Sequence, residues 1–376
     1  MLRFVARRVF WGLVTLLIVV SLAFFAVNLF LPYDFAVGLG FRPRAIETIR
    51  QQLGLDRPLV VQWLDYMSHF VRGDLGFTYE GSRVLSQVWS HLPTTVGIFA
   101  VGGIFAYLLG EWLGRLVAWS RHRHLASTAN VGSVLLFTAF PPFLVFLLGY
   151  FGGQRLLDLR SSLGLDRNPG GYPPGLLHLL AFGLLVALVS GLLVRAWARK
   201  REYAALRVGS VPVAVAGFLV GIWLLGVWGD GVDWLLWRNG VVAAAALLLI
   251  AFGEMMLVMS AGVSEEMAED YVFTARAKAI PNSRIRDRHV APNAVLPAIS
   301  RLVTSMPYLI AGLVIIEYST GASGLGLLFF RSIETGNVPV ILGILAVIGV
   351  IGIVMRIVLD IVQAVIDPRL REEVRA

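Results

Sequence analysis

The sequence predicts an all-α membrane protein that crosses the bilayer about eight times. Of its 376 residues, 57% are hydrophobic and only 15% are charged, whereas a soluble domain usually carries about 25% charged residues. A chain of this composition has too little polar surface to cover a water-soluble globule. The composition therefore excludes an ordinary soluble enzyme, a disordered chain and a fibrous repeat.

Eight apolar segments are long enough to span a membrane, since a spanning helix needs roughly 20 mostly apolar residues. They are 9–31, 93–118, 127–151, 176–195, 209–229, 239–263, 300–317 and 338–360. The first follows three arginines and exceeds the roughly 7–15 residues of a signal-peptide core, so we expect it to remain as an anchor. Segment 32–92 is too polar to span and is expected to form an external subdomain with short helices at 46–53 and 58–71.

The distribution of basic residues predicts that both termini face the cytoplasm. Loops on the cytoplasmic side carry an excess of Lys and Arg. With the N-terminus inside, the predicted cytoplasmic segments hold 17 of the 32 Lys and Arg residues. These segments are 1–8, 119–126, 196–208, 264–299 and 361–376. The net charge of +8 is thus explained by topology, and no nucleic-acid partner is expected.

The cytoplasmic loop 264–299 has helical spacing but no membrane-length apolar run. Asp270 stands near the start of a helix, where the dipole favours an acid. Val272, Ala275 and Ala279 share one face of that helix, and Pro281 should end it. On this pattern alone, a solvated helical hairpin between two spans is the better interpretation.

The loop also resembles the signature loop of ABC-importer permeases, and in particular that of the dipeptide/oligopeptide/nickel family. The matching residues are Asp270-Tyr271-Val272, Thr274-Ala275-Arg276-Ala277-Lys278, Arg288-His289 and Asn293-Ala294, with Pro292 at the proline of the superfamily pattern. Further matches, in order, are Arg72-Gly73-Asp74-Leu75-Gly76, Leu92-Pro93-Thr94-Thr95 and Asp367-Pro368-Arg369. One departure is Ala279, which stands at the usual glycine. Because a left-handed turn is disfavoured for alanine, we expect the bend to shift toward Pro281.

The resemblance implies a type I importer permease of the inner membrane with a six-helix core. It divides the chain into a first spanning helix (1–31), an external subdomain (32–92), core helices (93–152 and 239–372) and an insertion (153–238) that adds a hairpin at 176–229. The implied partners are a second homologous permease, two ATPase subunits, an external substrate-binding protein and membrane lipid. Peptides are the usual substrate of this family, with nickel, opines and oligosaccharides left open.

The resemblance also assigns coupling to the ATPases to a helix at 271–283. The implied coupling residues are Asp270, Tyr271, Thr274, Ala275, Arg276, Ala277, Lys278, Ala279, Pro292 and Asn293. We expect Ala275 and Ala279 to form the close contact with an ATPase, and Arg276 and Lys278 to face its acidic rim.

No catalytic, cofactor or metal site is expected in this chain. It has no cysteine and no G-x-x-x-x-G-K-[ST] stretch, so ATP and Mg²⁺ are expected on the partner ATPase subunits. His122 and His124 lack acidic neighbours and suit a solvated basic loop better than a metal site.

Two alternative functions rest on other residues. An ion-coupled secondary transporter would use the membrane acids Glu111, Glu254 or Asp360. An intramembrane protease would use Ser323 in a G-x-S-G turn. That chemistry needs a histidine from a later span, and the last histidine of the chain is His289.

Overall fold

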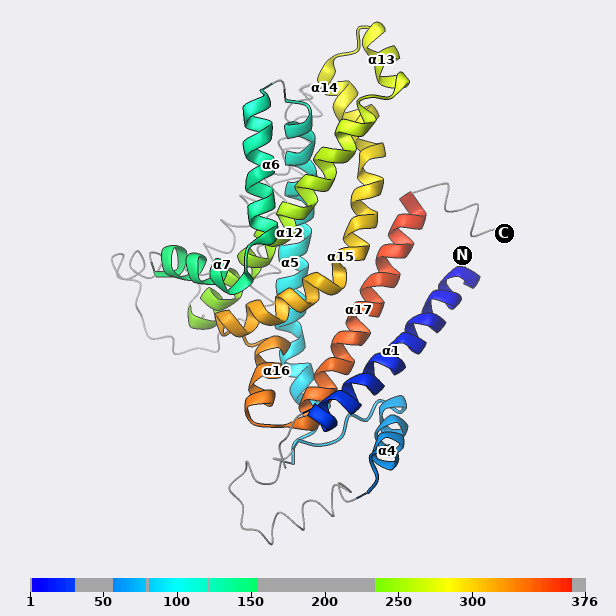
Figure 1. Ribbon diagram of the computed structural model, residues 1–376, viewed down its shortest axis with the longest axis vertical. Coiled ribbons are helices and arrows are strands. Elements are labelled where there is room, and N and C mark those ends of the chain that lie inside the picture. The colour runs from blue at the N-terminus through cyan, green and yellow to red at the C-terminus, as the bar shows by residue number, and fades with distance from the viewer. Residues whose placement is uncertain (1, 31–56, 79–80, 121, 155–233, 367–376) are drawn as a thin grey trace. The chain divides into compact units, whose positions relative to one another are not determined.

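The computed structural model describes residues 2–30, 57–78, 81–120, 122–154 and 234–366, and these are almost entirely helical. The longer helices are α1 (Leu2–Phe30), α5 (Val84–Ala118), α6 (Arg123–Thr138), α12 (Trp234–Glu266), α15 (Ala291–Thr320) and α17 (Val338–Ile366) (Figure 1). The shorter ones are α4 (Leu59–Val71), α7 (Pro141–Leu147), α13 (Asp270–Ala277), α14 (Asn282–Ile285) and α16 (Leu325–Glu334). Two π-helical turns, Leu148–Gln154 and Arg286–Val290, continue α7 and precede α15. The all-α fold class is confirmed.

Five stretches of helix are long and apolar enough to cross a membrane: Arg8–Leu29, Val84–Ala118, Asn239–Glu266, Asn282–Thr320 and Val338–Val358. They confirm the predicted spans at 9–31, 93–118, 239–263, 300–317 and 338–360. The predicted spans 176–195 and 209–229, and the predicted helix 46–53, lie outside the described residues. The total of eight spans therefore stays a prediction.

The predicted span 127–151 is wrong as one continuous helix. Helix α6 ends at Thr138, α7 begins at Pro141, and the two helices are bent by 108° at the break (Figure 1). The cause is local, because a proline disfavours helical geometry in the residue before it. Phe140 is accordingly extended, with φ −64° and ψ 119°. This pair of helices forms a broken span or a re-entrant segment.

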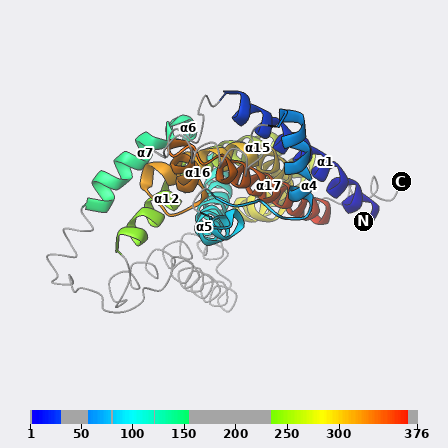
Figure 2. The same cartoon turned by 90° about the horizontal axis from the view of Figure 1, so that it is seen from below.

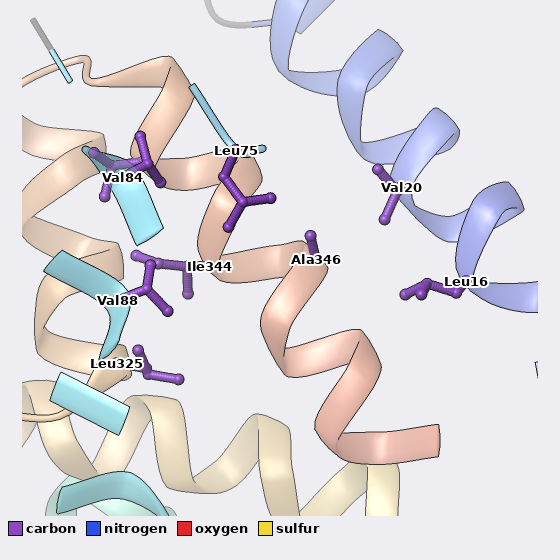
Figure 3. Packing of buried hydrophobic residues seen from close by; sticks show 9 residues of the cluster. Leu16, Val20, Leu75, Val84, Val88, Leu325, Ile344 and Ala346 are labelled. Atoms are coloured by element: carbon purple, nitrogen blue, oxygen red, sulfur yellow. The ribbon is translucent and has the colours of Figure 1, made fainter. Parts of the chain in front are cut away.

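The chain forms two compact units, of which the first comprises Met1–Pro93 and Ser323–Ala376. In this unit α1 packs along α17, and α4 packs on α1 (Figure 2). The core gathers side chains from distant parts of the sequence (Figure 3). Its buried members are Leu16, Val20, Leu75, Val84, Val88, Leu325, Val340, Ile344 and Ala346. Gly12 permits the close approach of the two long helices, since a Cβ there would lie 2.7 Å from Ile353 Cγ2.

The second unit, Thr94–Ala322, is organised around α12, which contacts both α6 and α15. Small residues allow α12 to pack closely against α5 and α6, as is common for helices in membranes. A Cβ on Gly110 of α5 would lie 2.6 Å from Met255 Cβ, and one on Gly114 would lie 2.8 Å from Met259 Cβ. Gly253 of α12 meets the backbone of α6 at Ser133 in the same way. Glycines thus place α12 at the centre of this unit.

Candidate functional site

Helix α13 lies beyond the ends of α12 and α15, in the loop that the sequence singled out (Figure 1). Asp270 occupies its first turn and Arg276 its last, which places each charge where the helix dipole favours it. The helix ends at Ala277, and α14 begins only at Asn282. The predicted 271–283 helix is therefore two helices joined by a turn.

The turn after α13 is centred on Ala279, which has φ 55°. The Ala279 N–H donates to Arg276 O at 2.9 Å, and the Ile280 N–H donates to Ala275 O at 3.2 Å. This pair of bonds defines a Schellman motif, which normally has glycine at this position. The expected shift of the bend to Pro281 is thus wrong. The two hydrogen bonds and the packing of Ile280 against the core below hold alanine in a glycine-like conformation.

One face of α13 is buried within the chain itself. Val272 and Ala275 pack with Val263 of α12, Ile285 of α14 and, among others, Ala294 of α15. The expectation that Ala275 contacts a partner is therefore wrong, because helical spacing identifies a shared face but not the surface that covers it. Ala279 is exposed, but in the turn rather than on the helix face.

A polar cluster ties the start of α13 to both neighbouring helices. The Tyr271 hydroxyl donates to Glu266 Oε2 at 2.5 Å, at the end of α12. Asn293 Nδ2, in the first turn of α15, donates to Glu266 Oε2 at 3.4 Å and to the Tyr271 hydroxyl at 3.3 Å. Burial, reinforced by the hydrogen bond to Glu266, raises the pKa of Tyr271 to about 12. The phenol therefore remains a hydrogen-bond donor further into the alkaline range than an ordinary tyrosine.

A third contact joins the last turn of α13 to the segment that follows α5. The Arg276 guanidinium lies over the ring of Trp119, with its Cζ 5.6 Å from the ring centroid, a cation–π arrangement. Sequence reasoning missed both Trp119 and Glu266. Neither residue belongs to the quoted motif, and nothing in the sequence pattern pointed to either of them.

The outward face of α13 carries one large apolar side chain among polar ones. Phe273 is 76% exposed, and Thr274, Ala277 and Lys278 around it are exposed as well. Pro292 is also exposed, in the first turn of α15, where a missing N–H does no harm. An aromatic ring on a braced helix is the type of residue that anchors a protein interface.

Two of the acids in the membrane helices, Glu254 and Glu111, pair with arginines. Glu254 is buried in α12 and accepts a hydrogen bond from Arg301 Nε of α15 at 2.7 Å. Glu111 pairs with Arg115 one turn along α5, at 3.2 Å. The Asp360 side chain lies outside the described residues. Ion pairs of this kind are typical of acids with a structural role, so they do not favour a proton-coupled transporter.

The described residues also give no support to the hypotheses of an intramembrane protease or a metal site. No hydrogen bond within them joins Ser323 to a histidine, and no group of three or more His, Cys, Asp or Glu side chains gathers in the part of the chain that the structure describes.

Comparison with known proteins gives two family matches and full-length relatives. Residues 179–372 match the binding-protein-dependent transport system inner membrane component, and residues 1–98 match the N-terminal model of such membrane components. A putative peptide permease protein of Brucella suis biovar 1 is 28% identical over 378 residues, covering 99% of both chains. A probable D,D-dipeptide transport system permease protein of Escherichia coli K12 is 27% identical, covering 97% of both.

A glutathione transport system permease protein of Escherichia coli O6:H1 is 25% identical, again over 99% of both chains. The matches lie in the order that the motifs predict, and the family model of residues 179–372 alone covers more than half of the sequence. The predicted resemblance is confirmed: the chain belongs to the family of inner membrane components of binding-protein-dependent transport systems.

Proposed function

We propose that the chain forms one half of the translocation pathway of an ATP-driven importer for peptides or related small solutes. As a member of its family, it is the multi-pass inner-membrane permease of a transport system that includes a substrate-binding protein and an ATPase. The peptide class is supported by the names of its relatives, which are peptide, D,D-dipeptide and glutathione permeases. The second half would be a similar permease, giving a pseudo-twofold pair with two ATPase subunits.

A coupling role is supported by the way in which packing and hydrogen bonds fix α13 to the spanning helices. Its inner face is built into the core of the second unit, and its polar cluster bridges Glu266 of α12 and Asn293 of α15. A force applied to α13 would therefore move the ends of two spanning helices together rather than bend a loose loop. Closure of the ATPase dimer on ATP would then shift the permease between its outward-open and inward-open populations.

In this proposal the contact with the ATPase is made by the outward face, with Phe273 as its anchor and Lys278 beside it. No residue of this chain takes part in covalent chemistry, and ATP and Mg²⁺ bind to the ATPase subunits. The membrane acids Glu111 and Glu254 serve packing rather than proton transfer, because each is paired with an arginine.

The test is Phe273→Ala, with Phe77→Ala as the matched control. Both phenylalanines are exposed, but Phe77 lies outside the loop, next to the start of α5. Removal of an interface anchor costs about 2 kcal/mol or more, which is a loss of roughly 30-fold in affinity. We expect the ATPase to dissociate from Phe273→Ala during purification and to remain with Phe77→Ala.

Substrate-stimulated ATP hydrolysis should fall with the same pattern. Full ATPase retention and full stimulation for Phe273→Ala would refute the coupling surface. The peptide class is tested separately by uptake of a labelled dipeptide in cells that lack their other peptide importers. Uptake that depends on a proton gradient and not on ATP would refute the importer mechanism itself.

A further inference from the structure

Helix α4 is fixed sideways onto α1 by one of its faces (Figure 2). Trp63 Nε1 donates to Ser21 Oγ at 3.1 Å. The Trp63 ring stacks on Phe25 with centroids 6.1 Å apart, and the Tyr66 ring lies 5.4 Å from that of Phe24. These contacts set the rotation of α4 about its own axis, so the direction of each remaining face is defined.

The rest of the helix surface divides into an apolar and a polar sector. At about 100° per residue, Val60, Leu64 and Val71 fall within about 40° of one another, directly beside the packed face. They are 59%, 55% and 73% exposed. The sector beyond them, farther from α1, carries four exposed polar residues, Asp65, Ser68, His69 and Arg72, and one exposed apolar residue, Val61. The apolar surface is thus a flank of α4 and not its outer face.

The contact with α1 lies within an apolar stretch of membrane length. The spanning part of α1 is Arg8–Leu29, and Ser21 precedes Leu29 by eight residues, or about 12 Å along the helix axis. The hydrocarbon layer is about 30 Å thick, so each half is about 15 Å deep. The contact therefore lies in the half of the bilayer that holds the C-terminal end of α1. On α1 itself, Leu22 and Leu29 are exposed, and helical spacing places both on the same side of the contact.

We propose that α4 is an interfacial helix, with Val60, Leu64 and Val71 inserted among lipid acyl chains and the polar sector turned toward headgroups and water. Amphipathic helices of this kind bury their apolar side about 5–10 Å into the boundary between headgroups and acyl chains. Lipid is the occupant that the geometry favours, because the apolar flank lies beside the exposed apolar surface of a spanning helix. A protein partner approaching from the water would meet the polar sector first.

The chain has no cysteine, so each introduced cysteine is the only one in this subunit, and the transporter without an introduced cysteine measures the background from the partner subunits. The variants are Leu64→Cys and Val71→Cys on the apolar flank, with Ser68→Cys and His69→Cys as controls on the polar sector. Each is spin-labelled in the assembled transporter and reconstituted into vesicles of phosphatidylethanolamine and phosphatidylglycerol. The accessibility of each label to oxygen, which concentrates in lipid, is compared with its accessibility to a water-soluble nickel chelate.

We expect the ratio of oxygen to nickel accessibility to be several-fold higher at Leu64 and Val71 than at Ser68 and His69. A water-like ratio at both flank positions would overturn the proposal. So would flank labels that the nickel chelate reaches until the substrate-binding protein is added, since that result would assign the flank to a protein partner. Val60→Cys repeats the measurement on the same flank if one of the other variants fails to assemble.

Discussion

Replacement of Ala279 by glycine should stabilise the turn that follows α13. Ala279 has φ 55°, a conformation that costs an L-residue about 1–2 kcal/mol. Glycine removes that strain but loses more backbone freedom on folding, at a cost of about 0.5–1 kcal/mol. The difference favours Ala279→Gly by about 0.5–1 kcal/mol. Opening of the turn should then become roughly two- to fivefold rarer.

The assay is amide hydrogen exchange of the loop peptides in the purified transporter, followed by mass spectrometry. The control is Ala277→Gly, the same chemical change in the last residue of α13, where glycine should destabilise by about 0.5–1 kcal/mol. Exchange in the loop should therefore slow in the first variant and speed up in the second. Faster exchange in both variants would show that Ala279 carries no strain and would refute the reasoning.

Three further predictions concern packing, pH and charge. Gly110→Ala would place a methyl group 2.6 Å from a carbon atom of α12 and should lower stability by about 1–3 kcal/mol. Gly103→Ala meets nothing within 4 Å and should raise the melting temperature slightly, because alanine suits a helix interior better than glycine by about 0.5–1 kcal/mol; equal melting temperatures for the two variants would contradict the packing argument. Folding raises the pKa of Tyr271 from 10.0 to about 12, so the stability that the neutral phenol contributes is complete below pH 10 and is lost as the pH rises toward 12. The melting temperature of Tyr271→Phe should therefore fall less steeply with pH in that window than that of the unchanged protein. Identical curves for the two proteins would argue against this. Arg301→Met should lower the stability by about 1–3 kcal/mol, because it leaves the buried Glu254 without this partner. Adding Glu254→Met should recover much of that stability in thermal unfolding. If the losses of the two single variants simply add in the double variant, the two residues do not stabilise each other.

The spanning helices could be predicted because long apolar runs require no knowledge of neighbours. The break at Phe140 was missed although Pro141 signals it locally, because apolar residues continue on both sides of the proline and the hydrophobic pattern shows one unbroken span. The loop motif located α13 correctly, but the sequence pattern did not show which of its faces is buried within the chain. Periodicity groups Val272 with Ala275, yet only the packed structure shows that α12 and α15 cover them.

Ala279 shows the opposite error, in which a correct local preference was overridden. Alanine does avoid the left-handed region, but two hydrogen bonds and the packing of the partly buried Ile280 hold it there. Glu266 carried no signal of its own, because its role depends on a tyrosine and an asparagine that only the fold brings near it. Residues of this kind become visible only when tertiary contacts are known.

The pairing of α1 with α17 has a consequence for the synthesis of the protein. Roughly 300 residues separate the two helices, and at ribosomal rates of about 5–20 residues per second their translation takes roughly 15–60 s. During that time the side of α1 that carries Gly12 and Leu16 lacks Ile353 and Gly349, the residues that it meets in the finished protein. This side of α1 is thus covered only after α17 has been made, whereas the side that meets α4 can pack much earlier. A chain truncated before α17 would present this unpaired surface to the quality-control proteases of the membrane.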